Sequence, residues 1–251
     1  MKTLRTALVV GCCAGALWGC AGPPQHDEDA ELTEEVTELL PDQPTDPAVV
    51  VAAPTNARTL LANEWVGVAD VTLADGELVP EHQAGVRYVY PLTACTVSVV
   101  DADSEEIVHM VPGELVTWPA GRLSLANVGE PDAEFLVIER SSVDLPPDLE
   151  NLPVPDEAID MERRGTVLLD DDGVLAVDVT LDQLQGDPLP PNQPSLVVAL
   201  TDCDLEFRGA DVADEERVMK AGEAIWQRAG FNVVGNLGDG PARFLVVAFR
   251  Q

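Results

Sequence analysis

The chain repeats itself, and this repeat restricts the fold to one architecture built twice. The stretch VPGELVTWPAGRLSLAN at 111–127 has a counterpart, KAGEAIWQRAGFNVVGN, at 220–236. Equivalent residues are 108 positions apart as far as Cys95 and Cys203. From Gly113 and Gly222 onward they are 109 positions apart. Register that holds this far indicates an internal duplication, with copies at about 56–140 and 164–250. Further matched segments are VTL at 71–73 and 179–181, LTAC at 92–95 with LTDC at 200–203, and FLV at 135–137 and 244–246.

Each copy shows the pattern of short β-strands separated by turns. Asp-Gly and Pro-Gly pairs mark turns in the first copy. Between these turns, the side chains of segments such as YVYPL and CTVSVV alternate in character with a period of two. AEFLVIER at 133–140 is typical of a buried strand, and ARFLVVAF at 242–249 repeats it. Strands and turns at this spacing predict an all-β fold, a sandwich or a barrel, in each copy.

The chain of 251 residues is strongly acidic, with 45 Asp and Glu, 14 Lys and Arg, and a formal net charge of −31. Such a surface repels nucleic acid and anionic lipid headgroups, so neither is an expected partner. At 46% hydrophobic residues, the chain still has enough apolar side chains for two small cores. Solubility is the simplest explanation of the acidity.

The N-terminus has the pattern of a secretory signal. A basic start precedes an apolar run at 7–17 that is too short to span a bilayer. The LWGC that follows resembles the lipobox of bacterial lipoproteins, with tryptophan in place of the usual small residue. The resemblance implies that residues 1–19 are removed and that Cys20 is acylated. Ala21 after it implies the outer membrane of the cell envelope, facing the periplasm or the cell surface. A rival box ending at Cys12 leaves almost no apolar run before it.

Composition divides the rest of the chain. Residues 20–48 are rich in acidic residues and proline and contain no Lys or Arg. Repulsion between like charges and stiff prolines predict an extended tether that holds the globular part away from the membrane. Residues 49–140 are predicted to form repeat 1 and residues 164–251 repeat 2. The acidic, proline-rich segment 141–163 is the predicted linker between them.

Two motifs in each copy resemble those of the cupin family. GELVPEHQAGVRYVYPL at 76–92 is similar to the first cupin motif, in which a glycine precedes His-x-His, a Glu and a second Gly. VPGELVTWPAGRLSLANVG at 111–129 is similar to the second, which runs from Gly to Pro-x-Gly, His and Asn. The resemblance covers almost all of 56–250. It implies a bicupin, with two tandem jelly-roll barrels that in this family often hold a metal.

The family's metal ligands are mostly missing from both copies. In repeat 1 the first histidine position is His82, the second is Ala84, and the glutamate position falls on or beside Arg87. The histidine of the second motif falls on Ser124, or on Leu123 if the register shifts. The corresponding residues of repeat 2 are Pro190, Asn192, Ser195 and Val233. A transition metal needs several oriented nitrogen, sulfur or carboxylate donors, so we expect no metal and no other cofactor in either barrel.

If the resemblance holds, the former ligand positions of repeat 1 face a cavity. An Arg with a His and hydroxyl groups is suited to a small anion such as a carboxylate. The candidate ligand-binding residues are His82, Arg87, Tyr88, Tyr90, Trp118 and Ser124. The alternative is that Arg87 is exposed and the aromatic side chains only pack.

Two function classes follow from this site. The first is an envelope-anchored, non-enzymatic module that binds a small ligand or a partner. The second is a metal-independent isomerase or lyase in which His82 acts as base and Arg87 holds an anion. The sequence leaves the ligand and the oligomeric state open.

Cys95 and Cys203 occupy equivalent positions in the two copies. An oxidising envelope permits a disulfide between them, provided that their Cα atoms come within about 7 Å near a pseudo-twofold axis. The alternative is two buried thiols that pack as small hydrophobic side chains.

Overall fold

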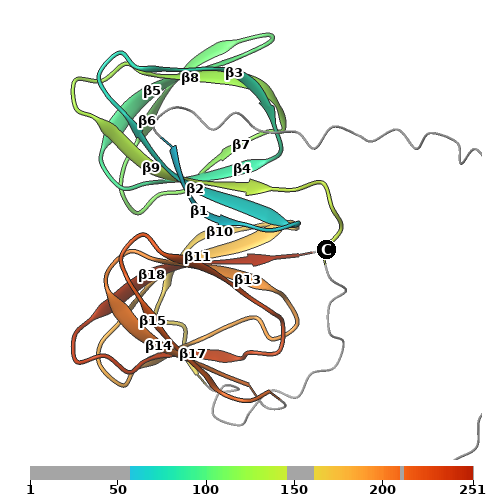
Figure 1. Cartoon of the computed structure of the whole chain (residues 1–251), viewed down its shortest axis with the longest axis vertical. Helices are drawn as coiled ribbons and strands as arrows, with labels where there is room; N and C mark the ends of the chain where they lie inside the picture. The colour runs from blue at the N-terminus through green and yellow to red at the C-terminus, as the bar shows by residue number, and fades with distance from the viewer. Residues whose placement is uncertain (1–56, 146–160, 210–211, 251) are drawn as a thin grey trace, which may run out of the picture. The chain divides into compact units, whose positions relative to one another are not determined.

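The structure is a computed structural model that describes residues 57–145, 161–209 and 212–250. These ranges contain strands and no helix, so the predicted all-β fold is confirmed there (Figure 1). Repeat 1 contributes β1 (Ala57–Ala62), β2 (Val66–Leu73), β3 (Leu78–Ala84), β4 (Arg87–Pro91), β5 (Cys95–Asp101), β6 (Glu105–Met110), β7 (Val116–Trp118), β8 (Gly121–Asn127) and β9 (Ala133–Arg140). Repeat 2 contributes β10 (Thr166–Asp170), β11 (Val174–Leu181), β12 (Gly186–Pro188), β13 (Ser195–Ala199), β14 (Cys203–Arg208), β15 (Glu215–Met219), β16 (Ala224–Gln227), β17 (Val233–Asn236) and β18 (Ala242–Phe249).

Several predicted segments fall wholly or partly outside the described residues. These are the signal peptide at 1–19 with Cys20, the tether at 20–48, and most of the linker at 141–163, and they stay predictions. Within the described ranges, no helix is long and apolar enough to cross a membrane.

The two repeats have the same topology. In repeat 1, a five-stranded sheet in the order β1-β2-β9-β4-β7 faces a four-stranded sheet in the order β3-β8-β5-β6. In repeat 2, the orders are β10-β11-β18-β13-β16 and β12-β17-β14-β15, which are the same strands counted nine further along. All of these strand pairs are antiparallel, and each pair of sheets closes around its own core (Figure 1). The duplication in the sequence therefore corresponds to a duplication of the fold.

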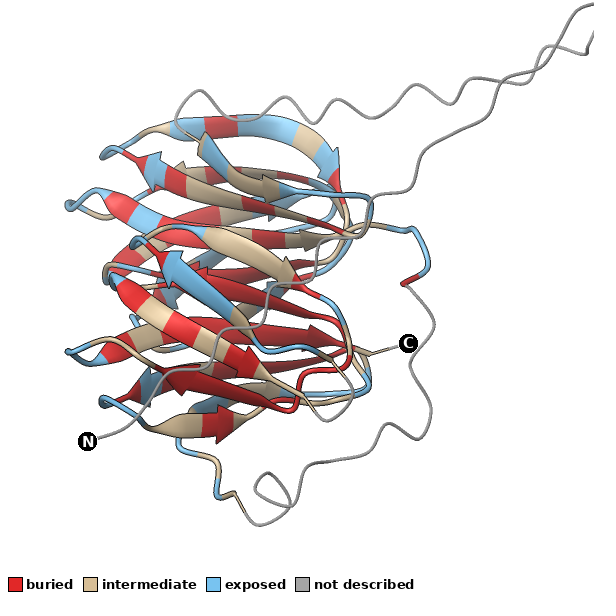
Figure 2. Ribbon diagram, turned by 60° about the horizontal axis from the view of Figure 1, so that its bottom comes forward, coloured by how far each residue is buried: buried red, intermediate tan, exposed pale blue. Residues whose placement is uncertain are grey.

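The central strands of the five-stranded sheets are apolar on both faces because both faces are buried. On β9, Phe135 points into the core of repeat 1, whereas Leu136 and Ile138 belong to a second core shared by the two repeats. On β18, Phe244 points into repeat 2, whereas Leu245 joins the shared core. A strand buried on both sides has no polar face, which explains the nearly unbroken apolar run of each segment. Most buried residues lie within strands, and the turns are exposed (Figure 2).

Aromatic side chains and one polar network fill the shared core. Trp65 stacks on Trp226 with ring centroids 5.5 Å apart, and Trp226 lies 5.6 Å from Phe249. We call this layer, formed by the outer faces of the two five-stranded sheets, the inter-repeat interface.

The polar network of this interface is centred on Asp178. Arg243 donates to both of its carboxylate oxygens, at 3.1 and 2.7 Å. The Tyr90 hydroxyl donates to Asp178 Oδ2 at 2.7 Å and accepts from Arg243 Nη2 at 3.0 Å. Burial, followed by the hydrogen bond to Asp178, raises the pKa of Tyr90. Tyr90 therefore joins repeat 1 to a charged pair of repeat 2.

The repeated asparagine is a structural element. Asn127 donates from Nδ2 to the carbonyls of Leu73 and Pro131, at 3.0 and 2.8 Å, and its Oδ1 accepts the Gly129 N–H. Asn236 makes the same three bonds in repeat 2, to Leu181, Gly240 and Gly238. A buried side chain that satisfies three backbone groups fixes the turn before the last strand of each repeat.

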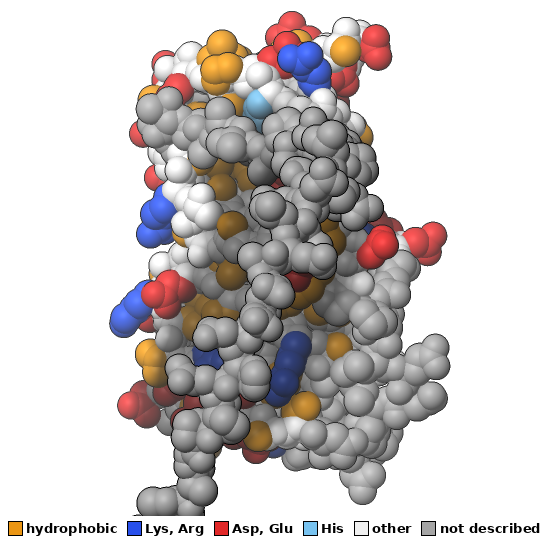
Figure 3. All heavy atoms as spheres, turned by 45° about the vertical axis from the view of Figure 1, so that its right-hand side comes forward, with side chains coloured by type: hydrophobic (Ala, Val, Ile, Leu, Met, Phe, Trp, Pro, Cys, Tyr) orange, Lys and Arg blue, Asp and Glu red, His pale blue; other side chains and the backbone are white. Residues whose placement is uncertain are grey.

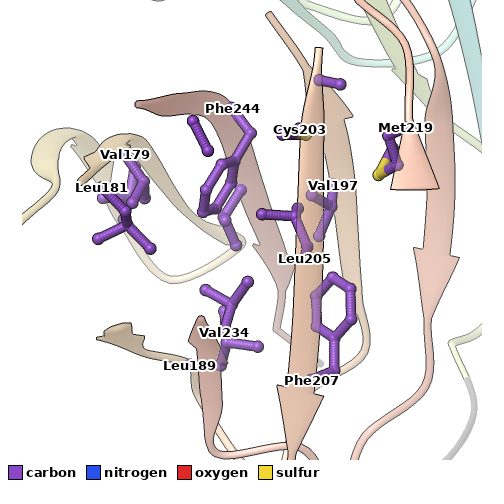
Figure 4. Packing of buried hydrophobic residues seen from close by; sticks show 14 of the residues in the cluster. Val179, Leu181, Leu189, Val197, Cys203, Leu205, Phe207, Met219, Val234 and Phe244 are labelled. Atoms are coloured by element: carbon purple, nitrogen blue, oxygen red, sulfur yellow. The ribbon is translucent and has the colours of Figure 1, made fainter. Parts of the chain in front are cut away.

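The core of repeat 2 contains an aromatic pair that repeat 1 lacks. Phe207 and Phe231 lie edge to face with centroids 6.1 Å apart, and both are buried. Figure 4 shows Phe207 beside Leu205, with Phe244 across the barrel. The equivalents of Phe207 and Phe231 in repeat 1 are Val99 and Arg122, so repeat 1 has no aromatic ring at either position.

The two cysteines do not pair, which corrects the disulfide alternative. Cys95 and Cys203 are both free and buried, the first in the core of repeat 1 and the second in the core of repeat 2. Each lies on a strand of a four-stranded sheet, and the inter-repeat interface is formed by the five-stranded sheets. Burial raises the pKa of both thiols, that of Cys203 to about 11.

Candidate ligand cavity in repeat 1

A cavity of about 650 Å³ lies in repeat 1. Its lining comes from β1, β2, β3, β4, β7, β8 and β9, and includes the segment just after β9. Most lining side chains are apolar, and the polar ones include Arg87, His82, Gln83, Glu139, Ser141 and Ser142. Repeat 1 is therefore hollow at the place where the sequence predicts a ligand.

Arg87 is the buried charge of this cavity. It begins β4, where it pairs with Glu139 of β9 on one side and with Trp118 of β7 on the other. Only 2% of the residue is exposed to solvent. The alternative prediction, an exposed Arg87, is therefore wrong.

Arg87 is only partly neutralised. Its Nε lies 3.8 Å from Glu139 Oε2, and the other oxygen of Glu139 accepts the Gly85 N–H at 2.7 Å. Neither Nη1 nor Nη2 has a hydrogen-bond partner among the described residues. Burial lowers the pKa of Arg87 and Glu139 partly offsets this, but a guanidinium stays charged in proteins.

Trp118 adds a third unpartnered donor. Its indole Nε1 is buried and has no acceptor in the part of the chain that the structure describes. The ring packs edge to face on Phe135, with centroids 6.5 Å apart, so its position is fixed by the core. Three buried donor nitrogens, which have no acceptor among the described residues, therefore belong to side chains that line one cavity.

His82 also lines the cavity. Its Nδ1 donates to the carbonyl of Pro80 at 3.0 Å, which leaves Nε2 as the free ring nitrogen. This orientation follows a break in the β3–β8 register between Val79 and His82.

Three predicted site residues do not line the cavity. Tyr88 and Tyr90 share a face, but it is the opposite face of β4 from Arg87, and both side chains lie in the inter-repeat interface. Ser124 alternates with Leu123 and Leu125, which take the inward positions on β8. Successive side chains of a strand point to opposite sides, so Arg87 and Tyr88 cannot share a pocket. Of the six predicted residues, His82, Arg87 and Trp118 line the cavity.

Glu139 lines the cavity and is not among the predicted site residues, although the sequence carries a signal for it. Phe135 and Val137 face the barrel on β9, and a period of two places Glu139 on the same side. Gln83, Ser141 and Ser142 lie at strand ends, where no periodic pattern identifies them.

Repeat 2 has different side chains at the equivalent positions. Ser195 replaces Arg87, and Gln227 replaces Trp118, both buried and paired in the same ladder. Leu175 and Val177 of the filled core replace Gly67 and Ala69. The charge and the space are thus both specific to repeat 1.

Comparison with known proteins identifies the fold. A tryptophan-to-tyrosine variant of oxalate decarboxylase from Bacillus subtilis superposes with a TM-score of 0.56 at 14% identity, over 79% of this chain and 76% of that chain. A structure of the same enzyme at pH 4.6 gives 0.55 at 14% identity, over 79% and 75%. A third, described by its Mn(II) centres, gives 0.54 at 14% identity, over 79% and 76%. The fold is that of a bicupin. No protein-family model and no curated protein matches the sequence.

The residues of this bicupin fold do not suit the metal of its neighbours. The described residues contain no group of three or more His, Cys, Asp and Glu side chains placed to hold a metal ion. His82 is the one imidazole among the cavity residues, Ala84 lies where a second is needed, and Arg87 brings a positive charge. A cation beside a buried guanidinium is repelled, so the donor set fits an anion and does not fit a metal.

Proposed function

We propose that the protein is a non-enzymatic binding module that holds a small anion of the carboxylate class in repeat 1, without a metal, on a lipid-anchored envelope protein. The observation that carries the proposal is the set of three buried donor nitrogens, Arg87 Nη1, Arg87 Nη2 and Trp118 Nε1, for which the described part of the chain supplies no acceptor. Leaving buried donors unsatisfied costs about 1–3 kcal/mol each, and more for charged groups. A cavity that keeps such donors is suited to a ligand that supplies the acceptors.

A carboxylate complements the charge of Arg87 and the two nitrogen atoms at the end of its guanidinium. Its two oxygens accept from the two Nη atoms of a guanidinium in a bidentate pair, which is the stronger kind of hydrogen bond. Glu139 lies on the Nε side, so Nη1 and Nη2 are the nitrogen atoms left for a ligand. The low dielectric of a buried site strengthens this attraction.

The binding proposal is tested with Arg87→Gln and Glu139→Gln. Arg87→Gln removes the positive charge and is expected to weaken benzoate binding at least about tenfold. Glu139→Gln removes a negative charge but keeps an oxygen for the Gly85 N–H, so it is expected to tighten binding several-fold. Isothermal titration calorimetry with benzoate measures both constants. The control is Arg122→Gln, because Arg122 pairs with Glu81 on the surface of the same repeat.

Opposite changes in benzoate affinity in the two variants distinguish an effect of charge from a loss of folding. Equal affinity in all variants contradicts the proposed site. Conversion of a bound carboxylate that disappears with His82→Ala contradicts the non-enzymatic part and supports the isomerase or lyase alternative.

The anchor part of the proposal is supported by the sequence alone. Cys20→Ser is expected to move the protein from the membrane fraction to the soluble fraction, because several acyl chains anchor firmly and none would remain. The matched control is Cys12→Ser, which leaves the protein on the membrane. Membrane retention of Cys20→Ser contradicts the assignment of Cys20.

Nucleic acid is not a proposed partner. The net charge is −31, and Lys and Arg side chains of the described residues lie apart from one another on the face shown in Figure 3. Phosphate backbones are held by clustered positive side chains.

A further inference from the structure

The walls of the repeat 1 cavity are mainly hydrocarbon. Val71, Val79, Leu125 and Phe135 line it and belong to the buried core of the repeat, and Val137 packs against them. A small hydrated anion gains nothing from such a wall, because its own charge loses water there without a partner. An apolar group attached to the anion gains the free energy of burial.

The space has an identifiable origin in two small residues. Gly67 and Ala69 lie on the cavity side of β2, where repeat 2 has Leu175 and Val177 in its packed core. A Cβ atom added at Gly67 meets nothing within 4 Å. The same topology is therefore filled in one repeat and open in the other through a change in side-chain volume.

The cavity is much larger than an anion of two carbons. A water molecule takes roughly 30 Å³ of liquid, so a space of about 650 Å³ holds on the order of 20 waters. Water against hydrocarbon walls has few polar partners, and an apolar ligand displaces it favourably.

We infer that the ligand of repeat 1 is an amphiphilic monocarboxylate, with its carboxylate on Arg87 and Trp118 and an apolar body of about six to ten carbons against the valine, leucine and phenylalanine wall. This inference rests on the proposed function and adds the chemical class of the ligand. A second carboxylate at the far end is unfavourable, because it would lie against hydrocarbon without a donor.

The test measures affinity along a series of straight-chain carboxylates. The probes are butanoate, hexanoate and octanoate, with 1-octanol and octanedioate as matched compounds. The protein is the full chain with Cys20→Ser, purified without detergent, because detergent would compete for the cavity. Burial of each methylene is expected to tighten binding about fourfold, so octanoate, with four more methylenes, binds roughly 250-fold more tightly than butanoate. Octanol and octanedioate are expected to bind at least about tenfold more weakly than octanoate.

Filling the cavity provides the second arm. Gly67→Leu introduces the side chain that repeat 2 carries, and it is expected to weaken octanoate at least about tenfold while butanoate changes less than about threefold. Ala69→Val is a smaller version of the same change, for use if Gly67→Leu does not fold. The control is Gly240→Leu, an exposed turn position of repeat 2 where an added Cβ also meets nothing within 4 Å.

The outcomes separate this inference from the proposed function. Equal affinity for butanoate and octanoate contradicts the inference that the ligand is amphiphilic, and it leaves the proposed carboxylate binding intact. Equal affinity for octanol and octanoate overturns carboxylate recognition itself, and binding of none of the probes overturns both.

Discussion

Replacing Phe249 with alanine is expected to lower the free energy of unfolding by about 3–5 kcal/mol. The Phe249 side chain is fully buried, lies 5.6 Å from Trp226, and belongs to the core shared by the two repeats. Truncation removes its burial and leaves a space that two rigid sheets cannot close. Urea denaturation followed by far-ultraviolet circular dichroism measures the change, with both repeats unfolding in one transition because they share this core.

The matched control is Val218→Ala on β15. Val218 is 75% exposed, so its truncation is expected to change stability by no more than about 0.5 kcal/mol. A loss below about 1 kcal/mol for Phe249→Ala would mean that the inter-repeat interface contributes little in solution.

Replacing Arg87 with methionine is expected to raise the free energy of unfolding by about 1–3 kcal/mol and to abolish carboxylate binding. The guanidinium is buried with two unpartnered nitrogens and one distant carboxylate at 3.8 Å. Methionine has a similar length and no charge, so it removes the desolvation penalty and keeps the packing. Glu139 keeps its bond from Gly85 and is 26% exposed, so it is not left buried and alone.

Arg243→Met gives the opposite sign and serves as the comparison. Arg243 makes a bidentate pair with Asp178 and donates to Tyr90, so its removal leaves a carboxylate that is only 10% exposed without its cation. We expect this variant to destabilise the protein. Destabilisation by Arg87→Met as well would show that Arg87 is structural and would contradict its role in binding.

Much of the fold was predictable because the duplication and the strand pattern are local properties of the sequence. The matched segments around FLV at 135–137 and 244–246 correspond to β9 and β18, the central strands of equivalent sheets. The resemblance of two motifs in each copy to those of the cupin family implied a bicupin, which the structural comparison supports at the level of the fold.

The candidate site was only partly predictable, because it depends on which face of a strand each side chain takes. Arg87, His82 and Trp118 line the cavity, whereas Tyr88 and Tyr90 occupy the inter-repeat interface. After Arg87, the residues of β4 show no alternation of polar and apolar side chains, and a strand without alternation gives no sign of which side is the barrel.

The hollow interior itself was beyond sequence reasoning. Gly67 and Ala69 are unremarkable residues in a strand, and their effect appears only when Leu175 and Val177 are seen in the packed core of repeat 2. The separation of Cys95 from Cys203 likewise follows from which sheets meet, a tertiary property that equivalent positions do not determine.

One buried thiol in each repeat lets the two barrels be compared inside a single molecule. Burial keeps both Cys95 and Cys203 protonated at neutral pH, so a thiol reagent modifies each of them only when its own barrel opens. The labelling rates at the two sites, resolved by peptide mapping, report the opening free energies of repeat 1 and repeat 2 separately. Because the two barrels share one topology and one solution, the difference between these free energies compares the local opening of the repeat that has a cavity with that of its counterpart.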